Sequence, residues 1–232
     1  MEPLINWLTG QGSDVFLVSL SGHHQKGINI KEVTASIWEK EMQQGYKLAK
    51  KTATVNGVPL YFLGYSLGAL LGQSMIALKH HYECFEKQVL LAPAIAIRPR
   101  SYILKCLLIF GKQRMLPSFS PRPYRANDAL PLAIYQLLFT EVKKVVQCGF
   151  NNWKVPTLIL IDPKDELISY KKLMQYMNQY KLTNCQILAL NSERKSRRGQ
   201  YHHLILDEET MGTANWEMVT REMQKFLFNT SK

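Results

Sequence analysis

Short apolar segments alternate along most of the chain with longer segments whose apolar residues recur at helical spacing. We predict strands at 14–20, 58–63, 87–92, 155–161 and 185–190, and helices at 3–9, 31–53, 67–80, 170–180 and 214–228. Regular alternation of strands and helices is typical of a mostly parallel sheet with helices on both faces. The pattern therefore predicts an α/β fold.

The segment 98–152 interrupts this alternation. Its apolar patches are separated by prolines, which end helices quickly: Pro99, Pro117, Pro121, Pro123 and Pro131. We predict an inserted set of short helices here, within a single domain that spans residues 1–232.

Composition is that of a globular protein, and it excludes a disordered chain. Of 232 residues, 46% are hydrophobic and 20% are charged. No apolar run approaches the ~20 residues that cross a bilayer, and the N-terminus lacks the pattern of a secretory signal. The cysteines are dispersed, without metal-ligand spacing: Cys84, Cys106, Cys148 and Cys185. We expect reduced thiols, a cytoplasmic location, and neither a metal nor an organic cofactor.

Charge is the unusual bulk feature, because 29 Lys and Arg against 18 Asp and Glu give a formal net charge of +11. A field of this sign attracts anionic lipid surfaces, nucleic acid or acidic substrates. No recognition helix, zinc finger or aromatic–basic RNA-binding strand is present, which argues against nucleic acid. We prefer a solvated basic surface with no single target, and peripheral contact with an anionic membrane is the alternative.

The strongest chemical signal is Gly64-Tyr65-Ser66-Leu67-Gly68, a G-x-S-x-G between a predicted strand and a predicted helix. A sharp strand-to-helix turn strains the serine backbone and lifts its hydroxyl out of the sheet. We predict Ser66 as a nucleophile, with the Leu67 N–H facing a developing oxyanion. We also expect that a Cβ at the flanking Gly64 or Gly68 would collide with neighbouring elements.

A serine hydroxyl needs a base, and that base needs an orienting acid. The pair His80-His81 lies at the far end of the helix that follows Ser66, whereas His202-His203 follows the last strand and could reach the turn. An acid should lie between serine and histidine in the chain. Three carboxylates follow the strand 155–161, at the edge where α/β active sites form: Asp162, Asp165 and Glu166.

Three segments together resemble the α/β-hydrolase superfamily, most closely its carboxylesterase, monoacylglycerol lipase and lysophospholipase branch. They are Gly64 to Gly68, Val155-Pro156-Thr157-Leu158 with Asp165-Glu166-Leu167, and Tyr201-His202-His203-Leu204. The resemblance implies that 98–152 is a helical cap. Its G-x-x-D-x-x-V pattern implies Asp165 as the acid, although Asp162 stands at the glycine position. It favours His202 as the base, because Leu204 and Asp207 follow at typical spacing, with His203 as the alternative.

The N-terminus departs from this family. Residues 14–24 look like the unit that in the family ends in D-x-x-G-H-G, so the strand that carries the second oxyanion N–H would precede Met1. We therefore expect N-terminal strands of the fold to be missing from residues 1–232. The alternative is that Asp14 to Leu20 takes the central position and that the loop Gly22–His24 supplies the second donor.

The function that this resemblance implies is hydrolysis of a carboxylic ester through an acyl-enzyme, on a lipid-like or small ester with a hydrophobic acyl group. A peptidase or amide hydrolase with the same triad is the alternative within the class. The alternative from another class is a non-catalytic or N-terminally truncated α/β-hydrolase-fold protein with little activity.

Overall fold

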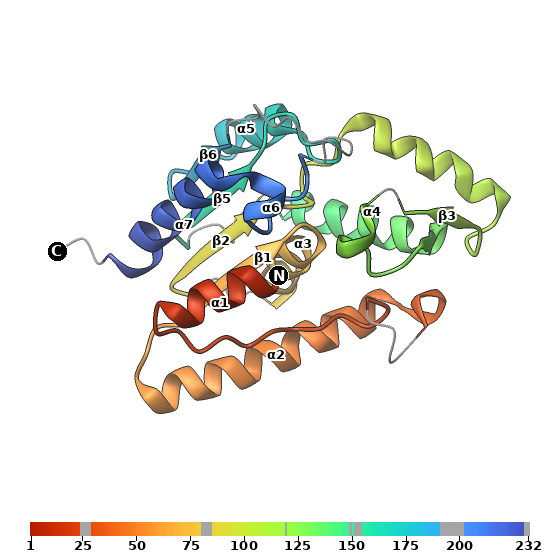
Figure 1. Ribbon diagram of the computed structural model, residues 1–232. Helices are drawn as coiled ribbons and strands as arrows, with labels where there is room; N and C mark the ends of the chain where they lie inside the picture. The colour runs from red at the N-terminus through yellow and green to blue at the C-terminus, as the bar shows by residue number, and fades with distance from the viewer. Residues whose placement is uncertain are drawn as a thin grey trace.

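A four-stranded parallel sheet forms the centre of the computed structural model (Figure 1). The structure describes residues 1–23, 29–79, 85–118, 120–148, 150, 155–190 and 202–229, without the side chains of residues 78 and 79. The strands are β1 (Tyr61–Tyr65), β2 (Lys87–Leu91), β5 (Thr157–Ile161) and β6 (Cys185–Ala189), in the order β1-β2-β5-β6. The prediction of a mostly parallel sheet is confirmed.

The register of the sheet brings the predicted chemistry to one edge. Tyr65 at the end of β1 pairs with Leu91 at the end of β2, and Leu91 pairs with Leu160 near the end of β5. Because the strands are parallel, the residues that follow them meet at the same side of the molecule. Ser66 and Asp162 are the first residues after β1 and β5.

Helices cover both faces because alternate strand residues point to opposite sides. Leu90, Ile159 and Ile161 pack with α3 (Leu67–Lys79), α4 (Leu132–Gln147) and α5 (Tyr170–Gln179). Val89, Leu91, Leu158 and Leu160 pack on the other face with α1 (Glu2–Gly10), α6 (Glu208–Met211) and α7 (Thr213–Phe228). The predicted helices thus match the observed ones to within a few residues.

The helix α2 (Ala35–Asn56) packs outside α3 instead of directly on the sheet, through a third cluster that contains Trp38, Met42, Leu71 and Ile76. Its start follows from Thr34, whose hydroxyl accepts a hydrogen bond from the Ile37 N–H. Its end follows from Gly57, which adopts a left-handed conformation with φ 64°.

The segment between β2 and β5, which we call the β2–β5 insertion, differs in part from the expected short helices. It contains the 3₁₀ helices η2 (Pro99–Phe110) and η3 (Arg122–Tyr124) and the longer helix α4. It also contains two short antiparallel strands, β3 (Met115–Pro117) and β4 (Ala129–Pro131). Three-residue strands bounded by prolines carry no clear alternation, so the hydrophobic pattern did not indicate them.

The prediction of a buried strand at 14–20 is wrong. These residues run as an extended segment between α1 and α2 (Figure 1) but pair with no strand among the described residues, and Leu17 is 58% exposed. The helix α2 holds the segment instead. Glu41 accepts hydrogen bonds from the N–H and the hydroxyl of Ser21, and the Trp38 indole donates to the Ser21 carbonyl at 3.1 Å. Strand formation requires a neighbouring strand to pair with, and hydrophobicity alone does not supply one.

A cavity of about 1020 Å³ separates segment 14–20 from β1. The Ser66 N–H donates to Leu91 on β2, and successive residues of a strand point their backbone groups to opposite sides. The N–H and C=O groups of Tyr61, Leu63 and Tyr65 therefore point to the cavity side of β1, where no described strand pairs with them. The position between segment 14–20 and β1, where the resemblance places the oxyanion strand, is thus occupied by a cavity.

The described cysteines are free thiols, as their dispersed positions predict. Cys106, Cys148 and Cys185 are free thiols, of which Cys185 is buried and Cys106 is exposed; Cys84 lies outside the described residues. Burial raises the pKa of the Cys185 thiol to about 12, so it stays protonated at neutral pH. No helix in the described part of the chain is long and apolar enough to cross a membrane.

Candidate active site

Ser66 occupies a strained turn between β1 and α3. Its φ is 48°, a left-handed conformation that is rare for a residue with a side chain. Three hydrogen bonds hold it there. Its N–H donates to Leu91 O at 2.9 Å, and its carbonyl accepts from the N–H groups of Leu70 and Ala94, each at 3.2 Å. The predicted strand–turn–helix context of Ser66 is therefore present.

The two glycines of the motif differ in what they do. A Cβ on Gly64 would lie 2.6 Å from the Cα and 2.9 Å from the N of Ala69, so the strand and α3 approach too closely for a side chain. A Cβ on Gly68 would have nothing within 4 Å, and the expectation of a clash there is wrong. Gly68 lies in the first turn of α3, where a Cβ points away from the neighbouring elements.

The histidine that contacts Ser66 is His203. Its Nε2 lies 2.8 Å from Ser66 Oγ, and its Nδ1 lies 2.8 Å from Asp165 Oδ2. An ionised carboxylate can only accept, so Nδ1 carries the proton and Nε2 accepts from the serine hydroxyl. Asp165 and Ser66 therefore both face His203, and not His202, which the resemblance favoured as the base.

His202 turns the other way. Its ring is buried, and Nδ1 lies 2.8 Å from Oδ2 of the buried Asp162. The two residues share one turn, and their rings face different partners, so only the His203 ring reaches Ser66. The apolar and acidic residues that follow the pair, Leu204 and Asp207, therefore do not decide which histidine contacts the serine.

Asp165 is fixed by its own backbone surroundings. Its Oδ1 accepts hydrogen bonds from the N–H groups of Leu167 and Ile168 at 2.7 and 2.8 Å, which leaves Oδ2 for His203. Arg98 Nε donates to the Asp165 carbonyl at 2.6 Å and ties this loop to the start of the β2–β5 insertion. The carboxylate therefore has one orientation.

Glu166, which the sequence offered only as a candidate acid, holds the backbone of the histidine pair. Its Oε1 accepts from the N–H of His202 at 2.8 Å, and its Oε2 accepts from the N–H of His203 at 3.0 Å. The carboxylate is acceptor-only, so it suits two converging N–H donors. Nothing in the local sequence indicates this contact, because it joins residues from two distant loops.

Tyr65 holds His203 through its backbone carbonyl. Its hydroxyl donates to the His203 carbonyl at 3.1 Å, and its ring lies against the His203 ring with centroids 5.4 Å apart. Burial, followed by the carboxylates of Asp165 and Glu166, raises the pKa of the Tyr65 phenol above its ordinary value. The phenol therefore remains a neutral donor. The sequence signal that could have indicated this contact is the position of Tyr65 directly before Ser66 in the motif.

The predicted oxyanion donor, the Leu67 N–H, belongs to the first residue of α3. The first N–H groups of a helix have no acceptor within the helix, so this donor is available beside Ser66. For the alternative second donor in the loop Gly22–His24, the His23 N–H already donates to Leu20 O at 3.1 Å. His24 lies outside the described residues.

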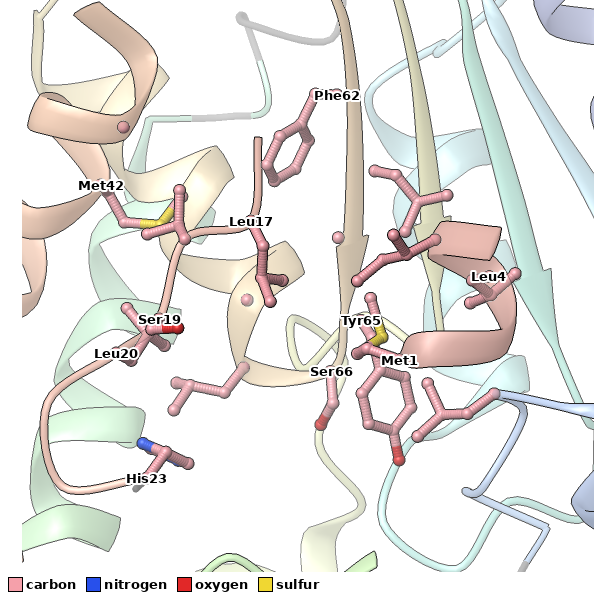
Figure 2. Close-up of a pocket in the computed structure, with 18 of the residues that line it drawn as sticks. Met1, Leu4, Leu17, Ser19, Leu20, His23, Met42, Phe62, Tyr65 and Ser66 are labelled. Atoms are coloured by element: carbon pink, nitrogen blue, oxygen red, sulfur yellow. The ribbon is translucent and has the colours of Figure 1, made fainter. Parts of the chain in front are cut away.

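The cavity next to segment 14–20 extends to the serine. Figure 2 shows Ser66 and Tyr65 at the end of β1, facing the same space as Leu17, Leu20 and His23. Leucines, phenylalanines and methionines dominate its lining. No group of three or more His, Cys, Asp or Glu side chains that could hold a metal ion occurs in the described part of the chain.

A parallel sheet with helices on both faces, and a strained serine turn that ends its edge strand, define the α/β-hydrolase class. Within this class the chain belongs to the family described as "Serine aminopeptidase, S33", whose model matches residues 1–136. The match includes Ser66 but ends before Asp165 and His203. No curated protein sequence gives a significant match.

Solved structures give the same fold. A structure from work on LipS and LipT, two metagenome-derived lipolytic enzymes, has a TM-score of 0.64 and 18% identity, over 89% of this chain and 78% of that chain. A soluble variant of monoglyceride lipase from Saccharomyces cerevisiae has a TM-score of 0.63 and 14% identity, over 91% of this chain and 73% of that chain. Monoacylglycerol lipase from Paleococcus ferrophilus has a TM-score of 0.55 and 16% identity, over 80% of this chain and 74% of that chain. At these identities the comparisons establish the fold.

The two motif glycines give a matched pair of variants. Gly64→Ala should destabilise the protein by about 1–3 kcal/mol, because the new methyl group meets the Ala69 backbone, which cannot rotate away. Gly68→Ala should leave stability unchanged or raise it by up to ~1 kcal/mol. Urea unfolding of the two variants measures the difference. Equal losses would contradict this account of the turn.

Glu166→Ala should lower the free energy of unfolding by about 1–3 kcal/mol, because two part-buried N–H groups lose their acceptor. Glu166→Gln keeps one acceptor oxygen and should lose less. Urea unfolding of both variants tests the order. If Glu166→Ala is as stable as the native protein, the carboxylate does not hold the histidine pair.

Proposed function

We propose that this chain is a carboxylic ester hydrolase that forms an acyl-enzyme on Ser66. The observation that carries the proposal is the hydrogen-bonded chain from Ser66 Oγ through His203 to Asp165, with both distances at 2.8 Å. The strained turn that presents the hydroxyl beside an apolar cavity supports it further.

The geometry suits the following steps. His203 Nε2 accepts the Ser66 proton as Oγ attacks the ester carbonyl carbon, and the Leu67 N–H stabilises the oxyanion. The intermediate collapses to the acyl-enzyme, and the imidazolium returns its proton to the leaving alcohol. Water, activated by the same imidazole, then releases the acid. Asp165 keeps Nδ1 protonated and stabilises the transient cation.

The lining of the cavity favours a substrate with an apolar acyl group. Leu20 and Leu63 line the cavity together with Ser66, and the β2–β5 insertion contributes Leu130, Ile134 and Leu138. We assign that insertion the role of a cap over the site. The similarity of fold to lipolytic enzymes and to monoacylglycerol lipases agrees with a lipid-like ester.

Amide hydrolysis, which the family description suggests, has less support. An aminopeptidase must hold the charged amino terminus of its substrate, and a carboxylate near the serine is the usual means. Among the described residues that line the cavity, Asp14 is the one carboxylate, and it is the first residue of segment 14–20. An ester substrate needs no such anchor.

The second candidate is a protein of this fold with little or no catalysis. The engagement of the His23 N–H by Leu20 favours it, because the loop that could supply the second oxyanion donor has one N–H fewer to offer. Loss of one such donor typically costs about 10²–10³ in kcat without disturbing the triad. The two candidates therefore differ in rate more than in the geometry of the triad.

Labelling with a fluorophosphonate probe separates the two candidates. The native chain should label covalently and should hydrolyse p-nitrophenyl esters, with longer acyl chains favoured up to the size of the cavity. Ser66→Ala should abolish both, since the nucleophile is gone. Absence of labelling in a folded native chain would support the non-catalytic candidate, and labelling that survives Ser66→Ala would reject Ser66.

The histidine pair offers an internal control. His203→Ala should lower kcat by about 10³-fold or more, because the hydroxyl then has no base. His202→Asn can still hydrogen bond to Asp162, and we expect a change in kcat below about tenfold with some loss of stability. Kinetics of both variants decide the assignment. A larger loss of kcat in His202→Asn would identify His202 as the base.

A further inference from the structure

Beyond the active site, an apolar stripe lies on the outer side of η2. A 3₁₀ helix has three residues per turn, so residues three apart lie above one another. Ile103, Cys106 and Ile109 follow this spacing and all are exposed, Ile103 by 67% and Ile109 by 81%. Phe110, 60% exposed, lies on a neighbouring row and adds to this apolar surface at the end of the helix. We call Ile103, Cys106, Ile109 and Phe110 the η2 stripe.

The inner side of η2 accounts for why this stripe stays outside. Tyr102 stacks on Phe139 of α4 with ring centroids 4.8 Å apart, and Leu104 packs against the same core cluster. The helix is thus anchored on the insertion by one side only. Figure 1 shows η2, in yellow-green, projecting away from the four-stranded sheet.

Basic residues flank the stripe along the chain, and one of those at 98–127, Arg125, is paired with Asp128. Residues 98–127 include seven Lys and Arg and no Asp or Glu. Of these, Lys105, Lys112 and Arg114 are exposed, and no carboxylate among the described residues forms an ion pair with them. Lys105 Nζ lies 4.8 Å from the centroid of Tyr102, so an aromatic ring holds its charge at the base of the helix.

We propose that the η2 stripe and the basic residues around it dock this protein on an anionic lipid surface. Large apolar side chains ringed by Lys and Arg fit the boundary between lipid headgroups and acyl chains, where the apolar groups insert and the cations meet phosphate. A second copy of the chain fits poorly, because symmetric pairing would set like charges against one another. Nucleic acid would satisfy the charges but would leave the apolar stripe exposed.

This docking does not depend on the proposed hydrolysis, so it is tested with the Ser66→Ala protein. Sedimentation with vesicles compares pure phosphatidylcholine with an equal mixture of phosphatidylcholine and phosphatidylglycerol. The protein should bind the mixed vesicles, and its binding should weaken as salt rises, because the lipid attraction is screened. Failure to bind the mixed vesicles more tightly than the neutral ones would overturn the proposal.

Variants assign the surface. The double variant Ile109→Ser/Phe110→Ser should weaken the partition onto mixed vesicles by about tenfold or more, and Lys112→Gln by about fivefold. Leu48→Ser/Val55→Ser, at exposed apolar positions of α2 among other lysines, is the matched control and should change little. All these positions are exposed, and thermal unfolding should be unaffected.

Two outcomes contradict the assignment. If the α2 variant loses binding and the η2 variant does not, the lipid surface lies elsewhere. If the protein dimerises in sedimentation equilibrium and Phe110→Ser makes it a monomer, the η2 stripe is an interface between copies.

Discussion

The backbone turn at Ser66 is the constraint on which the site depends. A left-handed residue with a side chain is unfavourable alone, and here the hydrogen bonds to Leu91, Leu70 and Ala94 stabilise it. The same turn brings α3 against β1 so closely that Gly64 cannot carry a Cβ. Sheet, helix and the Ser66 side chain are therefore fixed together, and Ser66 lines the cavity.

Three carboxylates in one loop after β5 hold the two histidines apart. Asp162 binds the ring of His202, Asp165 binds the ring of His203, and Glu166 binds the N–H groups of both. Each acid has a separate partner, so the two rings cannot exchange roles without breaking a buried contact. Such a network restricts each imidazole to one orientation, and the proposed role of His203 as a base depends on that orientation.

The cavity beside β1 connects the site to the part of the chain that departs from the expected fold. Segment 14–20 is held by α2 and not by the sheet, so the cavity side of β1 has no strand beside it. The cavity is lined by apolar side chains and by backbone groups on the edge of β1. The β2–β5 insertion therefore has apolar residues on two sides: some line the cavity, and those of the η2 stripe are exposed to solvent.

The sequence by itself determined the parallel sheet, its helices and the strand–turn–helix at Ser66, because these follow from periodicity and from a turn that few residues can form. The sequence could not decide between His202 and His203, since adjacent residues share their spacing and only the direction of each side chain separates them. It also missed the roles of Glu166 and Tyr65, which contact a loop far away in the chain. Segment 14–20 has the composition of a buried strand, but pairing is a property of neighbours in space, so only the tertiary structure settled that it is not one.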